Sequence, residues 1–315
     1  MALVCGIFGR ATISKSMTLP DLPIIDAHQH FWDLEANYLP WLRDAPPIPF
    51  RYGDYSSICR PYLPPDYRRD NAPHNVVKSV YVEAEWDHRD PIGETRYIAT
   101  LRQETGLPTV MVAQAWLDRE DAQSVLDQQA AFDFVRSVRH KPRANKSPRD
   151  TAPGGMTVAK WRAGYAHLKK VGLRFDLQTP WWHLGEAAAL ARDFPDQPII
   201  LNHTGLPSDR SPEGIAGWKA AMAGLATCPN VAVKISGIGM PGQKWTADLN
   251  RGVVLTTIEL FGPQRCMFAS NFPVDGLCGS FDEIFSGFRK IVADFSATEQ
   301  RALFHDNAIR LYGMT

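Results

Sequence analysis

The segment IIDAHQHFWD, residues 24–33, is an apolar run that ends in two histidines separated by one residue. Side chains two apart on a β-strand point to the same face, so Asp26, His28 and His30 are predicted to project together. Two imidazoles at the carboxyl end of a strand suit a divalent cation or the carbonyl group of a substrate. The competing interpretation is a pair of polar histidines that are merely hydrogen-bonded where the strand ends. The bias of histidine toward functional sites favours the first interpretation.

Seven further β-rich runs follow this one, with helical patterns between them. The predicted strands span residues 24–28, 76–85, 108–115, 134–140, 172–178, 197–203, 230–236 and 265–271, and the predicted helices 91–105, 119–129, 158–170, 184–193, 214–226 and 249–261. Strands that alternate with amphipathic helices indicate parallel βαβ units. Eight such units predict an α/β fold of the (β/α)8 TIM barrel type rather than an open doubly wound sheet. No Gly-rich nucleotide-binding motif follows the first strand, which argues against that alternative.

Residues 21–315 are predicted to form this single barrel domain, and residues 1–20 an N-terminal extension without fixed structure. The segment 31–70, directly after the first strand, is long and rich in aromatic residues and proline. Loops of this length in a compact barrel are usually functional, so we expect a lid or a substrate wall. A folded surface insertion is the alternative.

The composition limits the partners and the compartment. The chain has 34 Lys plus Arg and 34 Asp plus Glu, so its net charge favours neither nucleic acid nor an anionic membrane as a partner. No apolar run approaches the roughly 20 residues that cross a bilayer. The five cysteines are scattered and odd in number, which is typical of reduced thiols in a cytoplasmic enzyme. We therefore expect a small-molecule substrate; barrels of this kind often dimerise, so a homo-oligomer is compatible with the sequence.

Polar side chains recur at the carboxyl ends of the predicted strands, where TIM barrels carry their active sites. Convergence of so many polar strand ends predicts a catalytic crevice, although each residue alone would be a weak signal. In chain order these residues are His28, His30, Glu83, Glu85, Gln114, Arg139, His140, Asp176, Gln178, Asn202, His203, Lys234, Ser236, Ser270 and Asn271.

Five motifs (IIDAHQHFWD, ILNHTG, VKISG, CMFASNFPVD and HDNAIRLYG) resemble, in this order, those of the amidohydrolase superfamily. The chain is similar to its "amidohydrolase 2" branch of lactonases and related decarboxylases, and most similar to the group that hydrolyses sugar lactones and muconolactone-type lactones. The resemblance implies that His28 and His30 bind a metal or the substrate and that His203 faces the reacting centre. It also implies that Asn271 occupies the last-strand position of an aspartate that binds metal and takes a proton from the attacking water.

This asparagine is a departure from the family pattern. A neutral amide cannot act as a general base, and it is a poorer cation ligand than a carboxylate. Either the base has moved or the chemistry needs only a weak one. The carboxylates that would replace it are Asp275, Asp176, Glu83 and Glu85; for Asp275, a turn residue before Gly276 is the alternative.

Metal dependence stays open at this point. His28, His30 and His203 with one water would satisfy tetrahedral zinc, the divalent metal that the resemblance favours. Some lactonases of this branch are understood to work without metal, with cationic side chains that polarise the carbonyl. Here Arg139 and three of the substrate-binding candidates would supply such charges or grip a substrate carboxylate. The predicted substrate-binding residues are Trp32, His140, Arg143, Asp176, His183 and Lys234.

Three functions follow from these predictions. The leading hypothesis is a hydrolase that opens a lactone ring, because an activated ester needs less base strength than an amide, with His28, His30, His203, Asn271 and Asp275 as the catalytic set. The runner-up is a metal-dependent, non-oxidative decarboxylase of an aromatic or unsaturated acid, which the missing aspartate disfavours. The third is a non-catalytic binding protein on a decayed barrel, which the intact histidines disfavour.

Overall fold

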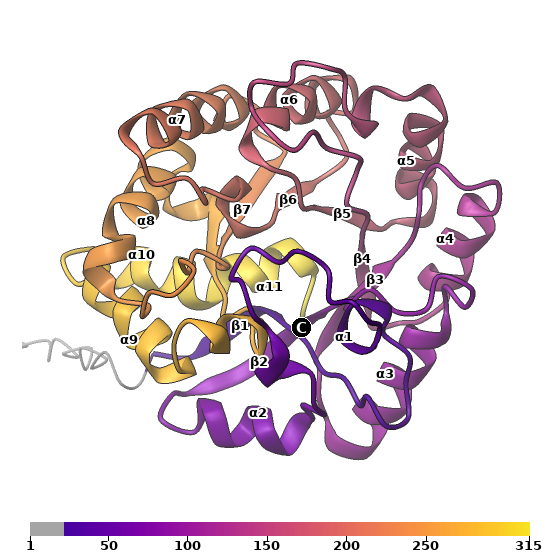
Figure 1. Cartoon of the computed structure of the whole chain (residues 1–315), viewed down its shortest axis with the longest axis horizontal. Helices are drawn as coiled ribbons and strands as arrows, with labels where there is room; N and C mark the ends of the chain where they lie inside the picture. Colours follow the sequence, from indigo (N-terminus) through magenta and orange to yellow (C-terminus); the bar gives the residue numbers. More distant parts are fainter. Residues whose placement is uncertain (1–21) are drawn as a thin grey trace, which may run out of the picture.

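The computed structural model describes residues 22–315, so the predicted extension at residues 1–20 lies outside the described part of the chain. Eight parallel strands form one sheet in chain order and alternate with helices that surround them (Figure 1), which confirms the predicted TIM barrel. The strands are β1 (Ile24–Gln29), β2 (Val76–Val82), β3 (Val110–Gln114), β4 (Val135–Arg139), β5 (Arg174–Leu177), β6 (Ile199–Leu201), β7 (Val231–Ile235) and β8 (Cys266–Phe268). The α-helices are α1 (Pro40–Arg43), α2 (Pro64–Asn71), α3 (Gly93–Thr105), α4 (Ala122–Ala130), α5 (Ala159–Val171), α6 (Leu184–Asp193), α7 (Pro212–Ala226), α8 (Ala247–Phe261), α9 (Phe281–Ile291), α10 (Ala297–Arg301) and α11 (Asn307–Tyr312).

The first and last strands meet at a seam. Gln29 forms a parallel bridge with Phe272, just beyond the end of β8. The carboxylate of Asp26 accepts hydrogen bonds from the backbone nitrogen of Ser270 at 2.8 Å and from its hydroxyl at 2.6 Å. The β1–β2 register shifts between Asp26 and Gln29, so the strict alternation predicted for residues 26, 28 and 30 is interrupted. Asp26 therefore links β1 to the segment after β8 by hydrogen bonds, and its side chain does not point toward the site as those of the two histidines do.

The C-terminal helix α11 covers one end of the barrel (Figure 1). Ala308, Tyr312 and Met314 pack against apolar side chains of the strands, including Ile25 and Val110. These contacts fill the interior from the amino ends of the strands.

The segment 31–70 is folded. It contains α1, a short 3-10 helix at Ser56–Ile58, and α2, and it is anchored by an antiparallel bridge between Trp32 and Tyr62. Its first half crosses in front of the barrel opening (Figure 1). The segment is therefore a folded insertion that also forms a wall over the strand ends, so both interpretations describe it in part.

Three strands, β2, β6 and β8, end two or three residues earlier than the sequence predicts, each before a polar residue of the site. Glu85, His203 and Asn271 have φ angles of 60°, 55° and 55°. A side chain at positive φ cannot continue an extended strand, so the backbone turns at these points. Non-glycine residues in this conformation are costly and cluster at functional sites.

The sequence also predicts that no helix spans a membrane and that the cysteines are reduced. Within residues 22–315, no helix is long and apolar enough to cross a membrane. The cysteines of this part of the chain, Cys59, Cys228, Cys266 and Cys278, are free thiols.

Candidate active site

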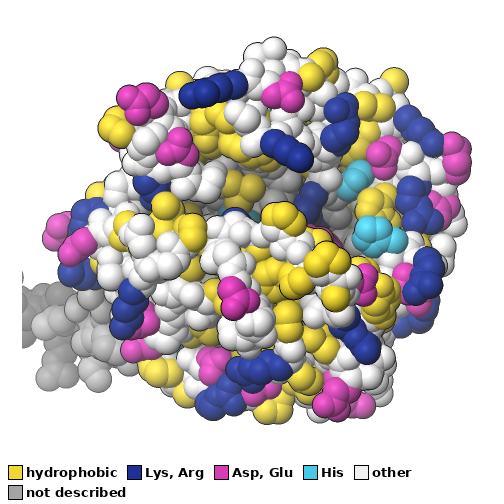
Figure 2. All heavy atoms as spheres, viewed as in Figure 1, with side chains coloured by type: hydrophobic (Ala, Val, Ile, Leu, Met, Phe, Trp, Pro, Cys, Tyr) yellow, Lys and Arg dark blue, Asp and Glu magenta, His cyan; other side chains and the backbone are white. Residues whose placement is uncertain are grey.

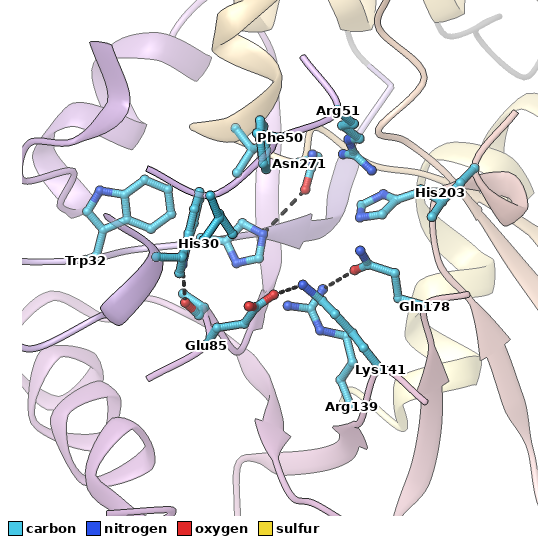
Figure 3. A pocket seen from close by; sticks show the side chains of 15 residues that line it. His30, Trp32, Phe50, Arg51, Glu85, Arg139, Lys141, Gln178, His203 and Asn271 are labelled. Atoms are coloured by element: carbon cyan, nitrogen blue, oxygen red, sulfur yellow. Dashed lines mark hydrogen bonds and ion pairs between the residues drawn. The ribbon is translucent and has the colours of Figure 1, made fainter. Parts of the chain in front are cut away.

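A cavity of about 350 Å³ opens at the carboxyl ends of the strands, where Figure 2 shows the face hollowed and Figure 3 shows its walls. Its size is that of a small-molecule site. Its walls combine aromatic and aliphatic side chains from the insertion with polar side chains from the strand ends. They are formed by His30, Trp32, Trp41, Ile48, Phe50, Arg51, Ala84, Glu85, Arg139, Lys141, Gln178, His203, Leu206, Asn271 and Val274.

Three histidines cluster at the base of this cavity. The ring of His28 lies 5.0 Å from that of His30 and 4.6 Å from that of His203, between centroids. His30 and His203 line the cavity, whereas His28 is fully buried beside them and neither of its ring nitrogens has a hydrogen-bond partner. Burial lowers the pKa of all three, and Arg139 lowers it further. The cluster is therefore uncharged at neutral pH.

The ring of His30 is held by one hydrogen bond, and its other nitrogen faces Asn271. Its Nδ1 lies 2.7 Å from the carbonyl oxygen of Val82, which can only accept, so Nδ1 carries the proton. Its Nε2 lies 3.4 Å from Oδ1 of Asn271. Burial lowers the pKa of His30 to about 3. Trp32, predicted to contact the substrate, lines the cavity and stacks on His30 with 6.1 Å between the ring centroids.

His203 is fixed from the side of β7. Its Nδ1 pairs with the hydroxyl of Ser236 at 3.0 Å, which leaves Nε2 for a ligand in the cavity. Gly237 follows with a φ of 61°, and a Cβ atom there would lie 2.5 Å from Nδ1 of His203. Glycine at this position therefore permits the imidazole to occupy its place.

Asn271 is oriented by Asp275. The amide nitrogen of Asn271 donates to Oδ1 of Asp275 at 2.6 Å, and the same oxygen accepts from the hydroxyl of Tyr52 at 2.9 Å. The other oxygen of Asp275 accepts from the backbone nitrogen of Gly237 at 3.0 Å. Burial raises the pKa of Asp275. Asp275 does not line the cavity, so its observed contacts are those of a residue that positions Asn271.

Of the four carboxylates considered as bases, Glu85 is the one that lines the cavity. It forms an ion pair with Lys141, which also lines the cavity. Glu83 forms a buried ion pair with Arg139, and Arg139 also donates to Oε1 of Gln178 at 3.0 Å. Two of the cavity's cations are thus neutralised by neighbouring carboxylates.

Two predicted substrate contacts lie outside the cavity walls. Nδ1 of His140 accepts from the backbone nitrogen of Leu117 and from the indole of Trp161, both at 3.0 Å. His140 therefore connects α5 to the loop that follows β3. Arg143 donates to the carbonyl oxygen of Pro153 at 3.1 Å within its own loop. Neither side chain lines the cavity in which a substrate is expected.

Three further predicted contacts also lie outside it. His183 pairs with Glu186 at 3.0 Å and accepts from the backbone of Asn145 at 2.9 Å, so it holds the loop that follows β4. Asp176 and Lys234 form an ion pair of 2.7 Å inside the barrel, and neither side chain is exposed. Burial lowers the pKa of Lys234 and Asp176 opposes that shift. This pair lies behind the site and does not form its wall.

Several wall residues were not singled out from the sequence. Ile48, Phe50 and Arg51 belong to the insertion, for which the aromatic composition predicted only a wall as a whole. Lys141 follows the end of β4 and was not singled out either. Position relative to a strand end was the available signal for Lys141, whereas no signal identified Arg51.

The residues as arranged do not fit the predicted zinc centre. Among residues 22–315, no group of three or more His, Cys, Asp and Glu side chains is arranged to hold a metal ion. His28 offers two unpartnered nitrogens, yet its ring is fully buried and does not line the cavity. Asn271, which follows β8, offers a neutral amide at a position where a carboxylate would attract a cation.

Many enzymes are TIM barrels with histidines at the base of a cavity at the carboxyl ends of the strands. The family model described as amidohydrolase matches residues 25–314, so the chain belongs to the amidohydrolase family.

Three similar proteins cover almost the whole chain. The protein y4mH of Sinorhizobium fredii is 41% identical over 297 residues, 93% of this chain and 99% of its own length. L-fucono-1,5-lactonase of Burkholderia multivorans is 26% identical over 308 residues, 92% of this chain and 96% of its own. The crystal structure of a Burkholderia multivorans amidohydrolase with bound zinc is 25% identical, with a TM-score of 0.76, and the match covers 93% of this chain and 99% of that one.

Proposed function

We propose that this amidohydrolase opens a lactone ring by hydrolysis. The observation that carries the proposal is the position of His203, whose Nδ1 pairs with Ser236 and whose ring lines a cavity that cations surround. Such a site stabilises negative charge on a carbonyl oxygen and offers only a weak base. An activated ester is the carbonyl substrate best matched to a weak base. The similarity to L-fucono-1,5-lactonase supports the same reaction class.

We assign one role to each group in this reaction. Water attacks the ester carbonyl and forms the new C–O bond, while His203 accepts the proton that the water loses. Arg139 and Lys141, at the cavity wall, keep N–H groups that their partner carboxylates do not occupy, and these groups donate to the oxyanion. The ring C–O bond then breaks, and the proton passes from His203 to the alkoxide oxygen. The products are one hydroxy acid per lactone, and no step requires a metal.

The aromatic side chains of the cavity wall favour a class of substrate. Trp32, Trp41 and Phe50 present aromatic faces, which pack on the apolar faces of a sugar ring or of a small unsaturated ring. A sugar aldonolactone and a muconolactone-type lactone both fit this description. We propose a small-molecule substrate of one of these two types.

The test is release of protons, followed with a pH indicator, across a panel of aldonolactones and muconolactones. Each lactone is offered to untreated enzyme and to enzyme treated with a chelator. Turnover in both samples is the expected result, and turnover lost with the chelator and restored by zinc would contradict the metal-free steps. No hydrolysis together with carbon dioxide release from an aromatic acid would replace the proposal by the decarboxylase. Tight binding without turnover would replace it by a binding protein.

A further inference from the structure

Three cationic side chains line the cavity, and they differ in how their charge is neutralised. Arg139 is in contact with the carboxylate of Glu83, and Lys141 with that of Glu85. Arg51, from the insertion, has a nearest carboxylate oxygen at 3.8 Å, in Asp275. Among the described residues, the charge of Arg51 is the least satisfied of the three.

The surroundings of Arg51 leave its donors available. Its Nε is buried without a hydrogen-bond partner. The oxygen of Asp275 nearest to it already accepts from Asn271 and Tyr52. The guanidinium carbon lies 4.7 Å from the ring centroid of Tyr52, which supports the charge through its π face but accepts no strong hydrogen bond. A planar set of unfilled donors is suited to a carboxylate.

The position of Arg51 relates these donors to the reacting centre. A Cβ atom on Gly237 would lie 2.8 Å from Nη2 of Arg51 and 2.5 Å from Nδ1 of His203, so the two side chains flank the same point. Figure 3 shows them next to each other on one side of the cavity. Arg51 also borders a second hollow of about 100 Å³, which shares Arg51 and Leu206 with the first. An anion at Arg51 therefore lies beside the site of bond cleavage, with space behind it.

We propose that Arg51 is the anion-binding, specificity-determining residue of this enzyme, and that its lactone carries a carboxylate next to the ring. The carboxylate pairs with the guanidinium, the ring carbonyl lies by His203, and the apolar part of the ring packs against Trp41 and Phe50. The inference rests on the proposed lactonase function and narrows it to anionic lactones.

The kinetic test compares γ-butyrolactone-γ-carboxylate with its uncharged methyl ester, with cleavage of the ring ester followed by product analysis. Arg51→Gln is expected to raise KM for the carboxylate about 10- to 100-fold, with kcat changed less than about threefold. The KM of the methyl ester is expected to stay unchanged. Arg51→Lys restores part of the affinity, because it returns the charge without the planar donor pair. Arg192→Gln, which removes an exposed arginine of α6 outside the cavity, is the matched control.

A binding test separates this inference from the proposed reaction. Cyclopentanecarboxylate and cyclopentanecarboxamide, which contain no ester, are titrated into wild type and Arg51→Gln by calorimetry. Wild type is expected to prefer the carboxylate, and Arg51→Gln to lose that preference. If no lactone is cleaved but the preference is present, the lactonase proposal fails and the anion site stands. Equal losses for charged and uncharged lactones, or no preference for the carboxylate in wild type, would overturn the inference.

Discussion

Nε2 of His30 and Oδ1 of Asn271 face each other at 3.4 Å, and both are hydrogen-bond acceptors. The proton of His30 is on Nδ1, because Nδ1 lies 2.7 Å from the carbonyl oxygen of Val82. The amide of Asn271 is held in this orientation because its nitrogen donates to Asp275. Two lone pairs this close favour a donor that approaches both atoms from the cavity, and a bound water or a substrate hydroxyl supplies one.

The first prediction concerns the amide at position 271. Asn271→Asp replaces the donor that contacts Asp275 at 2.6 Å by an acceptor, in a buried place. We expect the free energy of unfolding to fall by about 1–3 kcal/mol, since the interaction becomes a repulsion between oxygen atoms. Urea denaturation measures the loss.

The matched control is the exchanged pair Asn271→Asp with Asp275→Asn. It reverses the direction of the hydrogen bond and is expected to recover most of the lost stability. It also places a carboxylate opposite His30, so zinc affinity measured by calorimetry is expected to exceed that of wild type. Equal stability of the single and the double variant would show that the contact does not orient residue 271.

The second prediction is that His203→Ala lowers kcat by about 10²- to 10⁴-fold on any lactone that the enzyme turns over. The variant loses the imidazole that accepts the proton at the cavity wall, whereas the fold should be preserved. Circular dichroism melting checks the fold. His88→Ala, an exposed histidine, is the control, and a His203→Ala enzyme with near-normal kcat would disprove the assigned site.

The barrel could be predicted because period-two and helical patterns alternate along the whole chain, and this alternation has few folded solutions. His30, His203 and Asn271 could be placed for the same reason, since each lies at a strand end that the topology brings to one face. Asp26 was misplaced because a register shift interrupts the alternation of β1. Local irregularities of this kind leave no trace in hydrophobic periodicity.

The remaining errors have one physical origin. Polar residues inside a barrel and polar residues at its rim look alike in sequence, and only their depth along the strand separates them. Asp176 and Lys234 satisfy each other in the interior, whereas Arg51 reaches the cavity from an insertion with no regular pattern. Ion pairs between residues far apart in the sequence decide which polar groups remain free to bind a substrate. A single sequence does not show which residues form these pairs.

The third prediction tests the role of the interior pair. Lys234→Met leaves the carboxylate of Asp176 buried without its cation, although Tyr312 still donates to it at 2.9 Å. We expect a loss of about 3–5 kcal/mol, as for other broken buried ion pairs. Thermal and urea unfolding measure it, and Lys169→Met, which breaks an exposed pair, is the control. A loss of substrate affinity with unchanged stability would instead support the contact predicted from the sequence.

The fourth prediction concerns the backbone beside the site. Gly237→Ala places a methyl group 2.5 Å from the ring of His203, at a φ of 61° that favours glycine. The imidazole must move, so we expect kcat/KM to fall at least about tenfold while most of the secondary structure is retained. Gly242→Ala also lies at positive φ, with nothing within 4 Å of its Cβ, so it controls for backbone strain alone. Equal effects of the two substitutions would assign the loss to strain.

The fifth prediction follows from the lowered pKa of His30, which is about 3 in the folded protein against 6.5 in an unfolded chain. As the pH falls below 6.5, the unfolded chain binds a proton that the folded protein does not, so the free energy of unfolding decreases. The slope from this histidine is about 1.4 kcal/mol per pH unit, and it continues down to the folded pKa. Asp26, with its pKa raised to about 6 by burial, acts in the opposite sense.

Comparison between variants isolates the contribution of His30. Urea unfolding between about pH 6 and pH 5 is expected to show a shallower loss of stability for His30→Gln than for wild type. His88→Gln, at an exposed position, is expected to keep the wild-type slope. The quantity compared is the slope and not the absolute stability, because the loss of the bond to Val82 lowers the whole curve of His30→Gln. Parallel slopes for His30→Gln and wild type would mean that the buried ring accepts a proton in this pH range.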